Sequence, residues 1–356
     1  MHIETEEITA TLQRLIEIDD IDYIKGEIAW LINHISITYI KDDDEESEVA
    51  SEEDNAFVFS IIKDLKQIEK TQTLERSMYY IRRLIKSLTE VRSGKINDIN
   101  LNRWKEYDDL LTDSLWLFEK RDSTGKHTAD YWGNFIPQIP NQLIRRFTKE
   151  NELVLDTFLG SGTSLIECKR LCRNALGIEL QENVAYTAKE LISKDPVLKP
   201  TNTFQEVIIG DSSEVNLKQE LHRRNKKSFQ LVIMHPPYWD IIKFSEDQRD
   251  LSNKKSIEDF LSAFSKIVDN FTPFLDKGRY LAVVIGDKYQ KGELIPLGFL
   301  TMQEVLKRGY KLKSTIVKNF EDTAGKRGQK ELWRYRALAG GYYIFKHEYI
   351  FLFEKK

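Results

Sequence analysis

The sequence predicts an α/β fold in two parts, a Rossmann-like seven-stranded sheet preceded by an N-terminal helical domain. After residue 150, short β-rich runs alternate with helix-length segments, which is typical of βαβ units and a mostly parallel sheet. Before Pro137 the chain has no proline, and apolar residues recur at three- and four-residue spacing, which indicates helices. The 356 residues suffice for one large domain and a smaller one.

The N-terminal part is expected to be helical over residues 8–40, 57–88 and 99–118, with a break near residues 70–72. A polar, turn-rich segment follows at 121–134 and is a natural junction. We therefore predict a helical domain at 1–120 and an α/β domain at 121–356. The helical domain is a candidate surface for a homodimer contact or a partner subunit.

Charge divides the chain unevenly. Residues 1–54 contain 17 acidic and three basic residues, a net charge of −14, and the remainder contains 50 basic and 40 acidic residues, a net of +10. The acidic residues concentrate near 42–54, where we expect a solvated loop. The basic remainder is what a polyanion-binding surface requires.

Several classes of protein are excluded. Two cysteines, Cys168 and Cys172, do not form a disulfide framework and make a poor zinc site, so no metal is expected. The acidic start lacks the features of a signal peptide, and no apolar run reaches the ~20 residues that span a bilayer. We expect a cytoplasmic protein without membrane contact.

The expected strands lie at 153–156, 175–179, 206–209, 231–234, 280–285, 312–317 and 349–353. The last two are close enough in the chain to form a hairpin edge. In such sheets ligands bind beyond the carboxyl ends of the parallel strands. The residues that suggest a binding or catalytic role in this sequence fall at those carboxyl ends.

Three of these ends carry an acidic residue. The first strand runs into Asp156 and the turn Gly160-Ser-Gly162, where the missing Cβ atoms let a ligand approach the backbone. The second strand ends at Glu179, placed to accept hydrogen bonds from a ribose diol, and the third is followed by Asp211, placed to receive an adenine amino group. The spacing fits neither a dinucleotide motif nor a P-loop. Together the three acids predict a nucleoside pocket.

The fourth strand runs into His235-Pro236-Pro237-Tyr238. Two consecutive prolines fix the backbone and remove two N–H donors, so the carbonyls can accept hydrogen bonds from an amine. Tyr238 offers a flat face for stacking on a base. Accepting the protons of an exocyclic amine frees its delocalised lone pair for attack on a methyl donor.

These motifs resemble those of the amino-methylating DNA methyltransferases, the N4-cytosine and N6-adenine family. Residues 156–163, Asp-Thr-Phe-Leu-Gly-Ser-Gly-Thr, are similar to the family's cofactor motif, and residues 235–238 to its catalytic motif. Residues 135–144 resemble the segment that covers the methionine end of the cofactor. The resemblance spans about residues 130–355 and implies a methyltransferase sheet that binds S-adenosylmethionine and methylates DNA.

The resemblance also implies the roles of individual residues. It implies a cofactor site made of Phe135, Pro137, Asp156, Phe158, Gly160, Ser161, Gly162, Thr163, Glu179 and Asp211. It implies that His235, Pro236, Pro237 and Tyr238 hold a target base flipped out of the duplex. The family usually has Asp, Asn or Ser at the position of His235, so the target base is left open between cytosine and adenine.

DNA contacts are expected in the loop between the last two strands. This loop combines cations with aromatic residues, and its candidates are Lys326, Arg327, Lys330, Arg334 and Arg336. Two alternatives remain open at this point: a methyltransferase acting on RNA or a protein amide, and a nucleic-acid-binding subunit without catalysis. A restriction-modification setting is an expectation from the resemblance alone.

Overall fold

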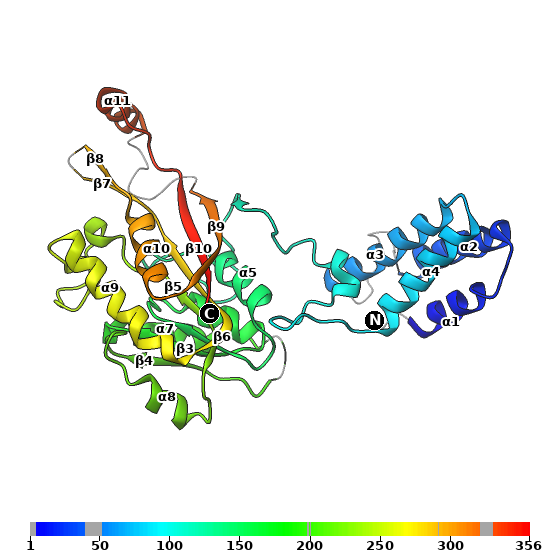
Figure 1. Cartoon of the computed structure of the whole chain (residues 1–356), viewed down its shortest axis with the longest axis horizontal. Coiled ribbons are helices and arrows are strands. Elements are labelled where there is room, and N and C mark those ends of the chain that lie inside the picture. Colours follow the sequence, from blue (N-terminus) through cyan, green and yellow to red (C-terminus); the bar gives the residue numbers. More distant parts are fainter. Residues whose placement is uncertain (1–4, 40–51, 198, 200, 291, 321–329) are drawn as a thin grey trace. The chain divides into compact units, whose positions relative to one another are not determined.

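The fold was analysed in a computed structural model, which describes residues 5–39, 52–197, 199, 201–290, 292–320 and 330–356. The chain divides into two compact units (Figure 1). The first contains residues 1–95 and 99–110, and the second contains residues 96–98 and 111–356. Residues 111–120, which the sequence pattern places in the helical domain, therefore belong to the second unit.

The helical unit is built from four amphipathic helices. They are α1 (Thr5–Leu15), α2 (Ile21–Tyr39), α3 (Glu52–Glu69) and α4 (Leu74–Thr89). Their apolar positions meet in one buried cluster that includes Leu12, Ile28, Leu65 and Ile81, each fully enclosed. The break between α3 and α4 falls where the sequence predicts it, and the Thr73 hydroxyl caps α4 by accepting from the Arg76 amide.

The second unit is organised around one eight-stranded sheet. Its strands are β1 (Leu115–Trp116), β2 (Leu153–Asp156), β3 (Asn174–Glu179), β4 (Gln205–Ile209), β5 (Phe229–Met234), β6 (Leu275–Ile285), β9 (Lys311–Asn319) and β10 (His347–Glu354). Their order is β1-β9-β10-β6-β5-β2-β3-β4. β10 runs antiparallel to both β6 and β9, and the other pairings are parallel. All seven expected strands are confirmed, and β1 is an eighth.

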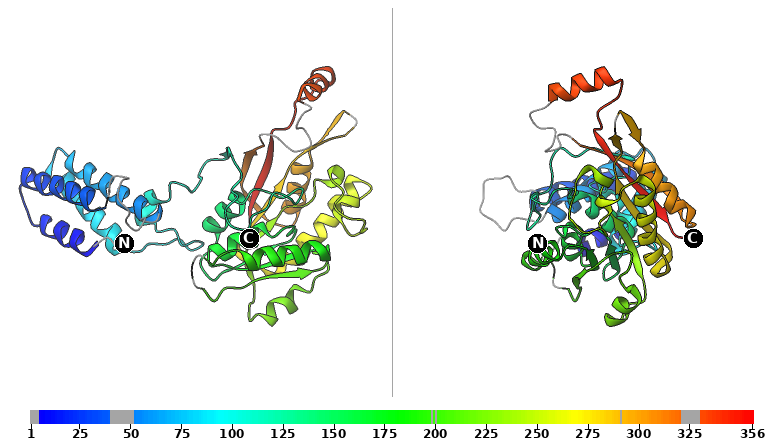
Figure 2. Two further views of the ribbon diagram at one scale, coloured as in Figure 1. Left: turned by 180° about the vertical axis from the view of Figure 1, so that it is seen from behind. Right: turned by 90° about the vertical axis from the view of Figure 1, so that its left-hand side faces the viewer.

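Helices cover both faces of the sheet (Figures 1 and 2). One face packs against α8 (Leu217–Arg223), α9 (Ile257–Phe271) and α10 (Leu297–Lys307), with Phe260, Phe264 and Phe271 in its core. The other packs against α5 (Gln138–Phe147), α6 (Thr163–Arg170) and α7 (Glu182–Lys194). Two-sided burial explains why the central strands are continuous apolar runs.

Smaller elements lie along the connections. They are the 3-10 helices η1 (Leu101–Glu106), η2 (Trp239–Ile241), η3 (Leu251–Asn253) and η4 (Thr272–Phe274), the hairpin β7 (Lys288–Gln290) and β8 (Glu293–Ile295), and the helix α11 (Lys330–Gly340). Tyr289 of the hairpin contacts Tyr342 and Phe345, which follow α11, with ring centroids 4.7 and 4.8 Å apart.

The N-terminal part departs from the sequence pattern in two segments. The expected helical stretch 8–40 is divided, because residues 16–20 separate α1 from α2. A helix at residues 99–118 is wrong: the segment forms η1, a loop and then β1, because the edge strand β9 offers free backbone groups that β1 pairs with. The expected acidic loop lies mostly outside the described residues, and residues 52–54 begin α3. No helix in the described ranges is long and apolar enough to cross a membrane.

Candidate methyl-transfer site

The candidate site lies along one edge of the sheet, where β2, β3, β4, β5 and β6 end. The parallel pairing of these strands brings their carboxyl ends together. β10 is antiparallel to β6, with Tyr349 opposite Ile285, so it begins at the same edge. Residues far apart in the sequence therefore meet here.

A glycine turn joins β2 to α6. Gly160 and Gly162 have φ values of +53° and +89°, a region that other residues adopt only under strain. A Cβ on Gly160 would lie 2.8 Å from the ring of Tyr131, and one on Gly162 would lie 3.1 Å from Ile192. The turn requires glycine at both positions, as the sequence motif predicts.

Glu179 ties the glycine turn to the end of β3. Its Oε2 accepts from the Gly160 amide and its Oε1 from the Gln181 amide, each at 2.9 Å. The side chain is buried, and burial raises its pKa to about 7, helped by the nearby carboxylates of Asp156 and Asp250 and opposed by the two amides. Each carboxylate oxygen retains a lone pair for a further donor.

Asp156 holds the first half of the same loop. It accepts from the Phe158 amide at 2.9 Å and from the Ser164 hydroxyl. Burial raises its pKa to about 6, although both hydrogen bonds lower it. Both of these hydrogen bonds come from protein groups, so the Asp156 carboxylate fixes the loop that carries Phe158.

This part of the site fits S-adenosylmethionine. Asp156, Glu179 and Asp250 are buried or nearly so, and their negative charges lie close enough to affect one another. A ligand that brings hydroxyl donors and a positive charge complements such a cluster. The Thr157 hydroxyl is also buried, without a hydrogen-bond partner among the described residues.

Asp211 lies just beyond β4. Its Oδ1 accepts from the amide and the hydroxyl of Ser213, at 2.8 and 2.7 Å, which fixes the carboxylate. The neighbouring Ser212 donates to the Thr157 carbonyl at 2.6 Å and so connects this loop to the end of β2. The three acids predicted from the sequence thus lie on adjoining loops of one sheet edge.

Residues 131–137, which we call the cover segment, precede α5 and fold over the glycine turn. The Asn134 amide donates to the Ser161 hydroxyl at 2.6 Å and its oxygen accepts from Thr163 at 2.8 Å, so these two predicted cofactor residues hold the cover segment. Tyr131 lies over Gly160. Sequence reasoning missed Tyr131 and Asn134, because residues 121–134 have the composition of a plain junction.

Phe135 connects the cover segment to the catalytic motif, and Pro137 lies at the start of α5. Pro137 caps α5 at its amino end, and Phe135 is buried with its ring centroid 4.9 Å from that of His235. The two motifs that the sequence places 100 residues apart are therefore in contact.

The catalytic motif leaves β5 in a constrained turn. The Tyr238 ring lies against Gly286 at the end of β6, where a Cβ would come within 2.8 Å of it. Trp239, the next residue, has φ +52° and is buried, and its indole nitrogen donates to the Lys254 carbonyl at 2.7 Å. Such strain in a non-glycine residue is found where a fold over-determines a functional turn.

His235 is uncharged in this environment. Burial lowers its pKa to about 4, with Lys318 also lowering it and Glu348 opposing. A neutral imidazole has one nitrogen able to accept a hydrogen bond. The site therefore keeps one acceptor at this position.

Two charged residues at the site escaped the sequence reasoning. Glu348 accepts from the Tyr238 hydroxyl at 2.6 Å and pairs with Lys318 at 3.2 Å, and both charged side chains are buried. They lie opposite each other in the β9–β10 pairing. Only the pairing of β9 with β10 brings them together, so no local sequence pattern marks them.

The structure describes only some of the expected DNA contacts. Arg334 and Arg336 are exposed on α11, and the Arg336 guanidinium lies 5.3 Å from the centre of the Trp333 ring. Lys326 and Arg327 lie outside the described residues, and Lys330 begins α11. Within the described ranges, no group of three or more His, Cys, Asp or Glu side chains is arranged to hold a metal ion.

Comparison with known proteins identifies the family. Residues 12–190 and 229–356 match the N6/N4 DNA methylases. The chain belongs to the DNA methylase family. The match begins at residue 12 and so includes the helical unit, which the sequence motifs alone do not connect to any family. Membership implies S-adenosylmethionine as the methyl donor.

Relatives and solved structures are similar over part of the chain. The Type II methyltransferase M.MjaII of Methanocaldococcus jannaschii is 24% identical over 151 residues, 40% of this chain and 28% of that protein. M2.LlaDCHI of Lactococcus lactis subsp. cremoris is 29% identical over 109 residues, 26% of this chain and 40% of that protein. The matches thus span less than half of each relative. TrmN from Thermus thermophilus aligns with 62% of this chain and 49% of its own, at 15% identity and a TM-score of 0.40.

Proposed function

We propose that this chain is a DNA methyltransferase that transfers a methyl group from S-adenosylmethionine to an exocyclic amine, N4 of cytosine or N6 of adenine. The observation that carries the proposal is the contact between the two motifs. The glycine turn with Glu179 and the turn 235–238 lie on one sheet edge, and Phe135 joins the cover segment to His235. Methyl donor and acceptor would then lie in one continuous site.

The residues have separable roles in this proposal. Glu179 and Asp211 would hold the hydroxyl and amino groups of the adenosine, and Phe135 would cover the methionine end. Bound S-adenosylmethionine supplies an electrophilic methyl group. The Pro236 carbonyl and His235 would accept the protons of the target amine, which localises its lone pair for attack. The ring of Tyr238, held against Gly286, would stack on the base.

Two observations support DNA as the substrate: the family of the chain and the distribution of charge along it. The amine of a paired base cannot be reached inside a duplex, so the base must be flipped out. Arg334 and Arg336 are exposed on α11 and would contact phosphates, together with Lys326, Arg327 and Lys330. The relatives named as Type II methyltransferases favour a restriction-modification setting for this chain.

Methylation of DNA in vitro tests the proposal. The purified chain is incubated with unmethylated DNA and methyl-labelled S-adenosylmethionine, the DNA is digested, and the nucleosides are identified by mass spectrometry. We expect N4-methylcytosine or N6-methyladenine, and none with Tyr238→Ala. Label in RNA or protein, or no transfer to a broad DNA panel despite cofactor binding, would contradict the proposal.

A further inference from the structure

A buried ion pair borders the catalytic turn. Lys318 and Glu348, on neighbouring strands, have side chains 7% and 4% exposed, and Nζ and Oε1 are 3.2 Å apart. Removing two charges from water is costly, and a buried pair contributes little stability over apolar residues of the same size. The position of this pair at the site edge therefore calls for a functional explanation.

The hydrogen bonds from this pair lead to the catalytic histidine. The Tyr238 hydroxyl donates its single proton to Glu348 at 2.6 Å, so its oxygen is left as an acceptor. His235 Nε2 lies 3.4 Å from this oxygen. Nε2 must carry the proton to donate to it, which leaves Nδ1 of the neutral ring as the acceptor.

We propose that His235, Tyr238 and Glu348 form a proton relay that takes the proton released by the methylated amine to Glu348. The relay rests on the proposed function. It assigns to Glu348, which lies on a different strand, the carboxylate that the motif lacks at position 235. Lys318 pairs with this carboxylate at 3.2 Å and holds it in hydrogen-bond distance of the Tyr238 hydroxyl.

The protons balance along the relay. The amine nitrogen gains a bond to the methyl carbon and loses one N–H bond, whose proton forms a bond to His235 Nδ1. The proton on Nε2 passes to the Tyr238 oxygen as the original Tyr238 proton passes to Glu348. His235 and Tyr238 end neutral, His235 with its proton on Nδ1, and Glu348 holds one additional proton. After the product leaves, Nδ1 releases its proton to solvent as the Glu348 proton returns through Tyr238 to Nε2, which restores the starting state.

The relay is tested by removing one hydroxyl or one charge at a time. Y238F keeps the ring that stacks on the base, and E348Q keeps an acceptor for the Tyr238 hydroxyl. We expect each to lower the single-turnover rate about 100-fold, within the range for general acid–base catalysis. The double variant should be no slower than either single variant, because the residues act as one unit. E348D should recover part of the rate.

A readout independent of turnover is the tautomer of His235. Nitrogen-15 NMR of the histidine-labelled chain, with the signal assigned by H235A, should show the proton on Nε2, and Y238F should shift this equilibrium. The matched control is D287N, because Asp287 also accepts from a tyrosine hydroxyl, that of Tyr349 at 3.2 Å, and among the described residues no hydrogen bond joins it to residues 235–238. D287N should retain the wild-type rate within about twofold.

The outcomes separate the two proposals. A wild-type chain that methylates DNA while Y238F works at the wild-type rate would overturn the relay and leave the proposed function intact. Additive rate reductions in the double variant, or a proton on Nδ1, would also overturn the relay. A wild-type chain that binds cofactor and DNA without methyl transfer would overturn both.

An independent observation concerns the helical unit. Arg76, Tyr79, Arg83 and Lys86 recur at three- and four-residue spacing on the exposed face of α4, and Arg82 adjoins them. Across the described ranges, Arg76, Arg82 and Arg83 make no ion pair with an acidic side chain, and the one acid near Lys86 is the exposed Glu90 at 3.6 Å. The exposed Glu75 lies on the same face, so the four cations Arg76, Arg82, Arg83 and Lys86 outnumber two acids and the face carries a net positive charge.

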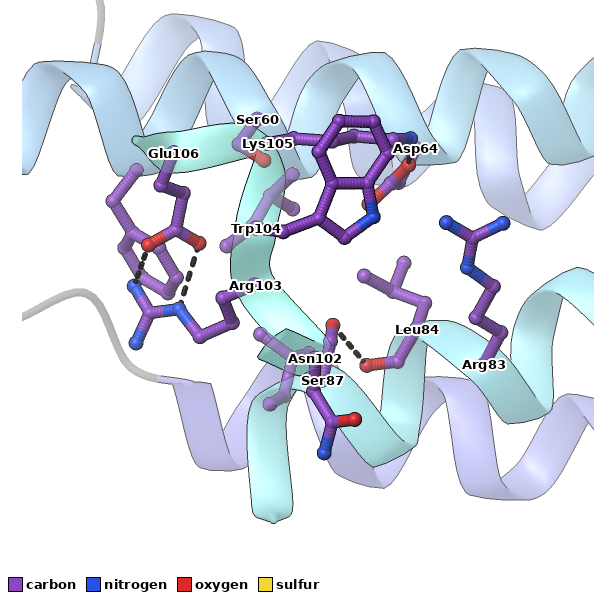
Figure 3. Close-up of a pocket in the computed structure, with 13 residues that line it drawn as sticks. Ser60, Asp64, Arg83, Leu84, Ser87, Asn102, Arg103, Trp104, Lys105 and Glu106 are labelled. Atoms are coloured by element: carbon purple, nitrogen blue, oxygen red, sulfur yellow. Dashed lines mark hydrogen bonds and ion pairs between the residues drawn. The ribbon is translucent and has the colours of Figure 1, made fainter. Parts of the chain in front are cut away.

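The face continues into a shallow pocket between α3, α4 and η1 (Figure 3). Arg83 and the half-exposed Trp104 line it, and its acids are already paired, Asp64 with Lys105 and Glu106 with Arg103. A phosphate here would meet Arg83 without repulsion from an unpaired acid. Arg76 lies 5.6 and 5.2 Å from the ring centres of Tyr79 and Tyr80, an arrangement that fixes its guanidinium.

We propose that this α4 face binds the phosphate backbone of duplex DNA, in addition to the contacts that the second unit makes with the target base. The proposal rests on DNA being the substrate. Charge complementarity carries it, because phosphate contacts supply sequence-independent affinity and position the enzyme on the duplex.

The salt dependence of DNA binding tests the α4 face. R82Q/R83Q/K86Q should weaken duplex binding by the full-length chain at least tenfold. It should also reduce the slope of log Kd against log salt, by up to about 0.9 for each phosphate that the variant can no longer bind. The matched control K227Q/K277Q/K311Q removes three exposed lysines of the other unit, at or near the amino ends of β5, β6 and β9. Cofactor affinity should be unchanged in both.

Three outcomes are informative. Equal weakening in both triple variants, or an unchanged salt slope in the α4 variant, would overturn the surface and leave the methyltransferase intact. A stronger effect on single-stranded RNA than on duplex DNA would overturn the choice of partner. A wild-type chain that methylates no DNA would remove the basis of both the proposed function and the α4-face proposal.

Discussion

The protonation of Glu179 gives a quantitative prediction for cofactor binding. Burial and the neighbouring acids Asp156 and Asp250 raise its pKa to about 7, whereas its two backbone donors, the amides of Gly160 and Gln181, lower it. An ionised carboxylate accepts hydrogen bonds from ribose hydroxyls better than a protonated one does. Cofactor affinity should therefore rise as the pH increases through 7, and binding should release a proton.

The size of the effect follows from the fraction of ionised Glu179. With a pKa of about 7, about one molecule in eleven is ionised at pH 6 and about ten in eleven at pH 8. If only the ionised form binds, the apparent Kd falls about tenfold between these values, because affinity scales with the competent fraction. That change corresponds to about 1.4 kcal/mol.

Isothermal titration calorimetry measures both quantities. Titrations at pH 6, 7 and 8 give the Kd, and repetition in buffers of different ionisation enthalpy gives the number of protons released. E179Q, which has no titratable group at this position, should bind weakly with a flat profile. A wild-type Kd that stays constant from pH 6 to 8, or an E179Q profile as steep as the wild type, would refute the ribose assignment of Glu179.

Three further predictions concern other parts of the site. Y238A should abolish methyl transfer and leave cofactor affinity unchanged; unaltered turnover would exclude a stacking role. Gly160→Ala should lower the free energy of unfolding by about 1–3 kcal/mol and weaken cofactor binding, because φ is +53° and the new Cβ would lie 2.8 Å from Tyr131, so a thermal shift within about 1 °C of wild type would contradict this. R334Q/R336Q should weaken DNA binding and reduce its salt slope while leaving cofactor binding intact; a gel-shift titration at two salt concentrations decides this.

The predictable part of the fold is local. The seven expected strands and the helical stretches 8–40 and 57–88 follow from apolar period and turn residues, which act within a few neighbours, whereas the break at 16–20 between α1 and α2 was not predicted. Residues 99–118 carry a helical period yet form η1 and β1, because pairing with β9 outweighs the local preference. Tertiary contact, and not sequence pattern, decides the structure of that segment.

The residues of the candidate site likewise divide into those that the sequence predicts and those that depend on tertiary contacts. Asp156, Glu179, Asp211 and the turn 235–238 were predictable, because each directly follows or ends a parallel strand and such ends share an edge. Glu348 was not, since it begins an antiparallel strand, and only the pairing of β10 with β6 brings it to that edge. Contacts of the cover segment likewise depend on chain folding over more than 20 residues.

The contact between Phe135 and His235 has a thermodynamic consequence. Asn134 fastens the cover segment to the glycine turn and Phe135 contacts His235, so in the proposed mechanism one short stretch of chain would form a wall of both the cofactor site and the base site. If S-adenosylmethionine orders this stretch when it binds, the conformational entropy cost of ordering it for the target base is lower. Linkage then requires reciprocity: the factor by which the donor tightens DNA binding must equal the factor by which DNA tightens donor binding. This wall should therefore determine how strongly the binding of one substrate favours the binding of the other.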